Sequence, residues 1–224
     1  MIEMNEIFSD FDSRVSLWGE KAMDTNDLAM MAEYITQKKI KTVSIVPEIV
    51  PFVWTCLEKF DVKILARCVF NPLQKTMLDE EMYDLGAKIK DVCKKGANGV
   101  QIFIKMRDFE RFMEMIGFVR NDLFFQHDLC ITLDINDIDV NNWQMIFQKL
   151  RDVGAHALVL SLNEDMGNRS DFVGRVYGML QNWDFNGEIH FILGNNFDRI
   201  DQVIRLIETE RPELSTKVKF FLDY

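Results

Sequence analysis

Basic residues are scarce in this sequence, in which 26 lysines and arginines stand against 36 aspartates and glutamates. The formal net charge of −10 argues against binding to nucleic acids or anionic membranes, since both attract basic surfaces. No apolar run approaches the roughly 18 residues that a membrane-spanning helix needs, and the first residues show no basic segment followed by an apolar one. We therefore expect no nucleic-acid partner, no membrane segment and no signal peptide.

Cysteine, histidine and proline are also few. The four cysteines form no Cys-x-x-Cys motif, and each lies in or beside an apolar stretch, which predicts reduced core thiols in a cytoplasmic protein: Cys56, Cys68, Cys93 and Cys130. The three histidines are far apart, so no metal site and no other cofactor is predicted. The four prolines form no linker with glycine and serine, and 224 residues suit one large domain, so we expect a single domain over residues 1–224.

One sequence pattern is present twice. Residues 94–104 and residues 152–162 each read as the end of a helix, a Gly-Ala step and then an apolar strand. Glycine suits the left-handed residue that ends a helix, and an unbroken apolar run suits a parallel strand that is buried on both faces. The two glycines, Gly96 and Gly154, are 154 − 96 = 58 residues apart, which is about two strand–helix units of a (β/α)8 barrel.

The same alternation of strand and helix runs through the chain. Apolar runs predict a weak first strand and then seven clearer ones, at residues 13–17, 42–46, 62–69, 99–105, 129–135, 157–162, 189–193 and 218–222. Helical patterns occur at residues 2–10, from Thr25 onward, and at 48–59, 79–94, 107–117, 141–153, 169–182 and 198–209.

Strict alternation with right-handed crossovers predicts a parallel sheet, and eight units close most economically as a barrel. We therefore predict an α/β protein with a (β/α)8, TIM-barrel-like fold. It would be incomplete and irregular after strand 8, because the sequence stops at residues 223–224, and the helix at residues 2–10 would cover one end of the barrel. The alternative is an open doubly wound sheet, although no G-x-G-x-x-G motif follows any strand.

Several segments resemble deoxyribose-phosphate aldolase, a member of the class I aldolase superfamily. Residues 45–51 read Ile-Val-Pro-Glu-Ile-Val-Pro and are similar to that family's turn after strand 2. Residues 62–73 resemble its third strand and the Phe-Pro-Leu loop, and the two Gly-Ala steps fall where the family has Gly-Ala-Asp before strands 4 and 6. The resemblance covers roughly residues 10–200 and implies a TIM-barrel fold with an aldolase ancestry.

The family's catalytic residues do not carry over. The lysine that forms its Schiff base falls on Val159, the strand-4 aspartate falls on Gln101, and the second lysine falls near His190. No lysine occurs anywhere between Arg151 and Arg169. The glycine-rich phosphate loop is reduced to residues 194–196, and the loop after strand 8 is missing. The resemblance therefore implies the family's fold without its mechanism, and we expect no tight binding of a phosphate monoester.

Other residues at the carboxyl ends of the predicted strands remain candidates for chemistry, because TIM barrels place their sites there. Lys105 is either an imine-forming lysine that has moved or a solvated residue. Asp134 is a general base, a metal ligand together with Glu164, or a turn carboxylate, and His190 is a proton shuttle or a hydrogen-bonded core histidine. Candidate ligand-binding residues are Arg67, Gln101, Ser161, Asn163 and Asn195.

Two hypotheses of function follow. The first is a diverged barrel without Schiff-base chemistry that binds a metabolite or a protein partner. The second is an aldolase or lyase that acts on a small carbonyl or sugar-derived substrate through Lys105, Asp134 and His190. Both hypotheses are compatible with a small-molecule ligand and with self-association.

Overall fold

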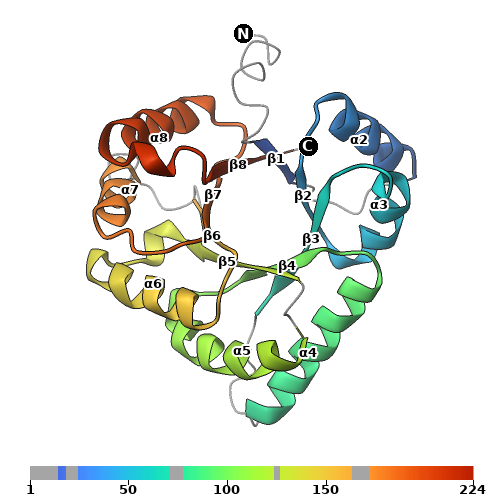
Figure 1. Cartoon of the computed structure of the whole chain (residues 1–224), viewed down its shortest axis with the longest axis horizontal. Coiled ribbons are helices and arrows are strands. Elements are labelled where there is room, and N and C mark those ends of the chain that lie inside the picture. Colours follow the sequence, from blue (N-terminus) through green and yellow to red (C-terminus); the bar gives the residue numbers. More distant parts are fainter. Residues whose placement is uncertain (1–14, 19–24, 71–77, 124–126, 163–171, 224) are drawn as a thin grey trace.

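Eight parallel strands form a closed barrel in a computed structural model that describes residues 15–18, 25–70, 78–123, 127–162 and 172–223 (Figure 1). The strands are β1 (Val15–Trp18), β2 (Thr42–Ile45), β3 (Lys63–Val69), β4 (Gly99–Phe103), β5 (Asp128–Asp134), β6 (Ala157–Ser161), β7 (Glu188–Ile192) and β8 (Val218–Asp223). Neighbours in sequence are neighbours in the barrel. The predicted (β/α)8 architecture is therefore confirmed, and the open doubly wound sheet is excluded.

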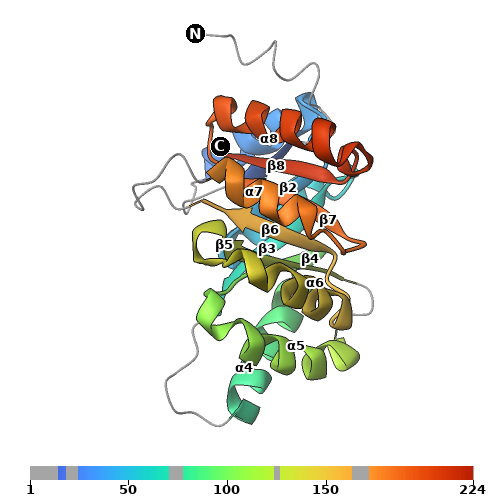
Figure 2. The same ribbon diagram turned by 90° about the vertical axis from the view of Figure 1, so that its left-hand side faces the viewer.

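Helices form a ring outside the strands, as the two perpendicular views show (Figures 1 and 2). They are α2 (Thr25–Gln37), α3 (Val50–Leu57), α4 (Leu78–Lys94), α5 (Phe109–Leu123), α6 (Trp143–Asp152), α7 (Phe172–Gln181) and α8 (Phe197–Glu210). Short 3-10 turns precede or follow several of them: η1 (Pro47–Ile49), η2 (Met106–Asp108), η3 (Ile135–Asp137), η4 (Val140–Asn142) and η5 (Pro212–Leu214). The helix that we predicted at residues 2–10 lies outside the described residues.

Strand β8 closes the barrel regularly, so the irregularity that we expected there is wrong. It pairs in parallel with β7 and also with β1, where the register runs from Val15 opposite Phe220 to Trp18 opposite Asp223. The ladder with β7 covers residues 218–221 and the ladder with β1 covers residues 220–223, so β8 is hydrogen-bonded on both sides. Closure of the barrel therefore does not depend on a helix that follows β8.

The repeated Gly-Ala pattern forms the predicted turn, in which a left-handed glycine ends a helix. Gly96 and Gly154 have φ angles of 111° and 54°, in the region that side chains disfavour. The next amide closes each turn onto the helix before it, from Ala97 N to Val92 O at 3.1 Å and from Ala155 N to Leu150 O at 2.8 Å. Each turn thereby sends the chain directly from a helix into a buried strand.

The apolar side chains form two layers. The larger layer lies between the barrel and the helices, where Trp143 stacks on Phe147 and Phe147 meets Trp183 edge to face at 4.9 Å. The smaller layer, which we call the inner layer, fills the barrel interior. It consists of Leu65, Cys130, Ala157, Val159 and Phe221, with Phe103 and Ile192 packed against it. The barrel is therefore a packed core at mid-height and not a channel.

The four cysteines differ in burial, which corrects the prediction that all are core thiols. Cys130 is buried, Cys68 and Cys93 are half-buried, and Cys56 is exposed on α3. Burial raises the pKa of Cys68 and of Cys93 to about 11, so both stay protonated thiols near neutral pH. Cys56 is exposed because the buried positions of α3 are Val50, Val53 and Leu57.

No helix of the described part of the chain is long and apolar enough to cross a bilayer.

Candidate functional site at the barrel mouth

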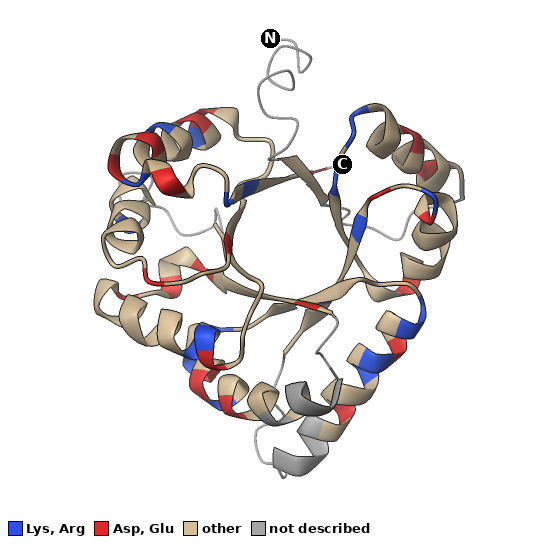
Figure 3. Ribbon diagram, viewed as in Figure 1, with Lys and Arg blue, Asp and Glu red and all other residues tan. Residues whose placement is uncertain are grey.

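The carboxyl ends of the strands form a polar mouth above the packed interior. Side chains alternate along a strand, so residues an even number of positions after a member of the inner layer, up to the end of the strand, also point into the barrel. This rule places Arg67, Asp134, Ser161 and Asp223 around the opening, next to Phe103 at the edge of the inner layer, and we call these five residues the mouth. The mouth combines one guanidinium, two carboxylates and a hydroxyl over an apolar floor. Most other charged residues lie on the outer helices (Figure 3).

Two predicted residues at or beside the mouth bond to backbone. Asp134 Oδ1 accepts a hydrogen bond from Asn136 N at 2.8 Å and thereby caps η3, which is the turn role that we gave as an alternative. Ser161 Oγ donates to Leu133 O at 3.4 Å. Asn163 and Glu164 lie outside the described residues. Among the residues that are described, no three His, Cys, Asp or Glu side chains gather to hold a metal ion.

The loop after β7 is closed off by the end of β8. Gly194 has a φ of 60°, and a Cβ atom there would lie 3.1 Å from Asp223 Oδ2. Asn195 is exposed and its Nδ2 donates to Asp223 O at 3.4 Å, while Asn196 Oδ1 accepts from Arg199 N and caps α8. The segment at residues 194–196 therefore works as a turn and a helix cap, beside a carboxylate.

Gln101 lies below the mouth in a fully buried hydrogen-bonded chain. Its Oε1 accepts from Ser44 Oγ at 2.6 Å, and its Nε2 donates to Thr132 Oγ1 at 3.0 Å. None of the three residues is more than 1% exposed. The amide thus joins β2, β4 and β5 with both of its ends bonded, which fixes its orientation. An amide held in this way accepts no proton near neutral pH.

Val159 lies at mid-height in the barrel and is completely buried. In the strand register it stands between Thr132 of β5 and His190 of β7. Two lysines, Lys63 and Lys219, occupy inward positions of their strands, but both lie near the amino ends and bond to carboxylates. Lys219 pairs with His190 in the register, but its amine bonds to Glu188, toward the amino ends of the strands and away from the inner layer.

His190 belongs to a charged cluster at the amino ends of the strands, which we call the basal cluster. The cluster contains Lys63, Asp128, His156, Glu188, His190 and Lys219. Lys63 Nζ lies 2.7 Å from Asp128 Oδ2, and Lys219 Nζ lies 2.8 Å from Glu188 Oε2. His156 links the two pairs, at 3.4 Å from Asp128 and 3.6 Å from Glu188.

His190 is only 1% exposed, and its Nε2 lies 2.7 Å from Glu188 Oε2. A carboxylate only accepts hydrogen bonds, so Nε2 carries the hydrogen and Nδ1 is the bare nitrogen. Nδ1 is buried and has no hydrogen-bond partner among the described residues. Burial lowers the pKa of His190, and this effect exceeds the opposing effect of Glu188. The histidine is therefore neutral in the folded protein near pH 7.

Glu188 is the carboxylate on which the basal cluster converges. Burial alone would raise its pKa, but the contacts with His156, His190 and Lys219 outweigh burial and lower the pKa well below its usual range. Sequence reasoning missed Glu188, Asp128, Lys63 and Lys219. The available signal was a charged residue at the start of four predicted strands, at a position that alternation directs into the barrel.

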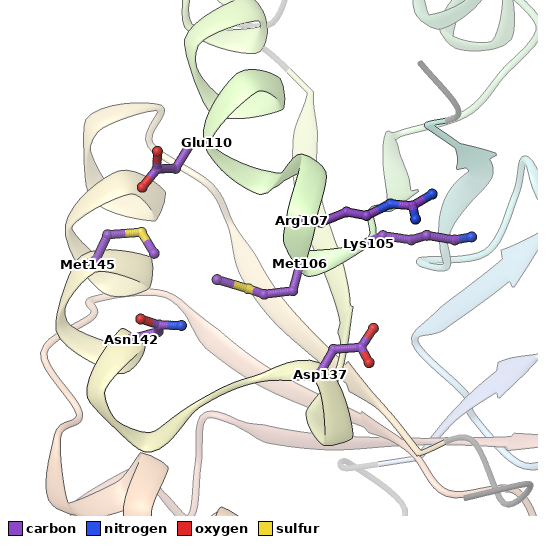
Figure 4. Close-up of a pocket in the computed structure, with 7 residues that line it drawn as sticks. All are labelled: Lys105, Met106, Arg107, Glu110, Asp137, Asn142 and Met145. Atoms are coloured by element: carbon purple, nitrogen blue, oxygen red, sulfur yellow. The ribbon is translucent and has the colours of Figure 1, made fainter. Parts of the chain in front are cut away.

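Lys105 is exposed and lies outside the barrel interior, because β4 ends at Phe103 and not at residue 105 as predicted. It lines a groove of about 600 Å³ between the connections that follow β4 and β5 (Figure 4). The three residues proposed for catalysis therefore lie in three places: Lys105 in the groove, Asp134 at the mouth and His190 in the basal cluster.

The closed barrel with its ring of helices and its polar mouth defines this chain as a (β/α)8 barrel protein. Neither a model of a known protein family nor a curated protein matches the sequence. Solved structures do match the fold. A Toxoplasma gondii protein that is provisionally assigned as a deoxyribose-phosphate aldolase superposes with a TM-score of 0.69 at 14% identity, over 99% of this chain and 94% of that one.

Two further structures show how widely this fold is shared. The deoxyribose phosphate aldolase of Aeropyrum pernix, described as a unique tetramer, gives a TM-score of 0.66 at 12% identity over 96% of this chain and 87% of that one. A Streptococcus agalactiae protein provisionally named the copper homeostasis protein CutC gives 0.63 at 11% identity, over 94% and 97%. Because aldolases and CutC share the barrel, the fold alone does not define an activity.

Proposed function

We propose that this chain is a diverged relative of the deoxyribose-phosphate aldolases that forms no Schiff base and binds a small polar metabolite at the mouth. The observation that carries this proposal is the apolar inner layer around Val159, a position that resembles the family's imine lysine. Valine has no amine, and the buried amide of Gln101 replaces the carboxylate that the family uses in proton transfer. The aldolase-like turn at residues 45–51 and the shared fold support the ancestry.

The composition of the mouth supports a polar ligand that is not a phosphate ester. Arg67 stands with Asp134, Asp223 and Ser161, which suits hydroxyl and carbonyl groups better than a dianion. A barrel binds phosphate with backbone N–H groups of the loops after strands 7 and 8. Here the loop after β7 has the Asp223 carboxylate beside Gly194, which repels a phosphate.

Borohydride reduction in the presence of deoxyribose 5-phosphate is expected to leave the mass of the protein unchanged. The reason is the absence of a lysine at Val159, and the measurement is intact-mass spectrometry followed by peptide mapping. A class I aldolase treated in parallel confirms that trapping works. A reduced adduct on any lysine at a strand end would refute the proposal.

The alternative is an aldolase or lyase with relocated residues, and one observation favours testing it. Lys105 is an exposed amine in the same groove as the carboxylates of Glu110 and Asp137, which are suitable proton acceptors. An adduct that maps to Lys105, and that is lost in Lys105→Ala, would establish this alternative in place of the first proposal.

We also propose that the chain associates with a second copy of itself through the outer face of α3. This helix contains no charged residue, and Phe52, Trp54 and the nearby Phe60 are 57%, 43% and 51% exposed. Three half-exposed aromatic side chains present about 300 Å² of apolar surface. This is over a third of the roughly 800 Å² that each partner buries in a standard interface, so these side chains would form its apolar centre. The absence of charged residues on α3 itself also limits the repulsion between copies that each carry −10. The tetramer of the Aeropyrum pernix aldolase supports self-association.

Replacing Phe52 with glutamate is expected to dissociate this assembly, weakening self-association at least about 10-fold, because a charge would enter an apolar interface. The measurement is molar mass by light scattering after gel filtration. The matched control is Tyr83→Glu on α4, where the aromatic side chain is 80% exposed and outside the patch. A wild-type protein that stays monomeric at high concentration would contradict the proposal.

A further inference from the structure

The groove beside Lys105 is separate from the mouth, and its chemistry is different. It has a volume of about 600 Å³, within the usual range for ligand pockets. It is lined by Lys105, Met106, Arg107, Glu110, Asp137, Asn142 and Met145, all from the connections after β4 and β5 and the first turns of α5 and α6. No residue of the inner layer contributes to it.

Two methionines give the groove an apolar surface. Met106 and Met145 are partly buried and pack against the larger apolar layer, one from each side of the groove. In Figure 4 the side chain of Met106 extends between the two walls toward Met145 and Asn142. Methionine is flexible and polarizable, so such a surface adapts to apolar groups of different shape.

The charged residues of the groove are balanced in sign, and Glu110 lies apart from the two cations, whereas Asp137 points to their side (Figure 4). Lys105 and Arg107 are cationic, while Glu110 and Asp137 are anionic. Among the residues described, Lys105, Glu110 and Asp137 form no ion pair, and the exposed guanidinium of Arg107 has only a contact of 3.5 Å with Asp108. Figure 4 shows Lys105 and Arg107 side by side and pointing away from Glu110 and Asn142, with Met106 between them.

We propose that this groove binds a short peptide of two or three residues with free termini. Lys105 and Arg107 receive the carboxylate, for which a guanidinium and an ammonium are the standard donors. Glu110 receives the terminal ammonium, and the amide of Asn142 both donates to and accepts from a peptide bond. The side chains of the peptide lie on Met106 and Met145. The site is independent of the metabolite that we propose for the mouth.

The separation of the charges selects a peptide over a free amino acid. The ammonium and carboxylate of an amino acid share one carbon atom, whereas an extended peptide spans about 3.3–3.6 Å for each residue. Arg107 lies in η2 and Glu110 in the first turn of α5, and their side chains point in opposite directions with Met106 between them (Figure 4). The equal number of positive and negative groups also favours a neutral zwitterion over an anion.

Calorimetric titration with tri-L-alanine tests the proposal. We expect saturable binding, and we expect tri-L-alanine that is acetylated and amidated at its ends to bind about 10-fold more weakly or worse, because each charged terminus contributes a charge-assisted hydrogen bond. Free L-alanine is expected to bind as weakly as the capped peptide.

Two variants locate the site. Arg107→Gln and Glu110→Gln are each expected to weaken tri-L-alanine binding about 5- to 10-fold, because each removes one charged contact. The matched control, Glu58→Gln at the end of α3, is expected to bind like the wild type, and thermal melts verify that all three variants fold. Absence of binding at 10 mM peptide, equal binding of the capped peptide, or unchanged binding in both groove variants would each overturn the proposal. The borohydride experiment is unaffected by any of these outcomes, since it traps an imine with deoxyribose 5-phosphate and does not depend on peptide binding.

Discussion

Replacing Glu188 with alanine is expected to lower the free energy of unfolding by about 3 kcal/mol. The carboxylate contacts Lys219 Nζ at 2.8 Å and His190 Nε2 at 2.7 Å, and it lies 3.6 Å from His156. Its removal leaves the Lys219 ammonium, which is 20% exposed, without its carboxylate, and leaves the N–H of His190 without an acceptor. The value is at the lower end for a broken buried ion pair, because Glu188 itself keeps 26% of its side-chain surface exposed.

Urea denaturation measures this loss as a shift of the midpoint with an unchanged slope. Glu188→Gln is expected to lose less unfolding free energy than Glu188→Ala, because the amide oxygen still accepts a hydrogen bond from His190. The control Glu58→Ala removes an exposed carboxylate and is expected to change stability by less than about 0.5 kcal/mol. A change in Glu188→Ala as small as that of the control would show that the basal cluster does not stabilise the barrel.

The fold was predictable because short segments of the sequence specify each turn and strand. The Gly-Ala steps at residues 96 and 154 need left-handed glycine, and the apolar strands that follow have the composition of strands buried on both faces. The ends of the elements were less predictable. Residue 105 was assigned to a strand that ends at Phe103, because the chain leaves the barrel there to form η2.

The candidate site was predicted less well, because the height of a residue in the barrel depends on strand register. His190 was placed at the mouth, yet it stands two residues below Ile192 and bonds downward to Glu188, one residue before the predicted start of that strand. The basal cluster draws residues from β3, β5, β7 and β8 and from the turn before β6. The charged residues at the strand starts are visible in the sequence, but only the closed sheet brings their side chains together in one cluster.

Acidification from pH 7 to pH 5 is expected to destabilise the protein through His190. Burial holds the pKa of His190 below that of the unfolded chain, so below about pH 6.5 the unfolded state binds a proton that the folded state does not. Stability then falls as the pH falls, by a slope that approaches about 1.4 kcal/mol for each pH unit until the folded pKa is reached. Below about pH 4.3, protonation of Glu188 in the unfolded chain adds a second loss of the same sign, because its folded pKa is also lowered.

The variant His190→Gln isolates this contribution, because glutamine donates to Glu188 but does not titrate. The groups that face His190 are Glu188, Lys219 and His156, and the buried thiol of Cys130 lies in the adjoining inner layer. All of these groups remain in the variant, so the difference between the two unfolding curves cancels their titration. We expect the wild type to lose stability relative to the variant as the pH falls from 7 to 5. A wild type that instead gains stability over this range would mean that His190 is a cation paired with Glu188, and that the ion pair outweighs the cost of burying the imidazolium.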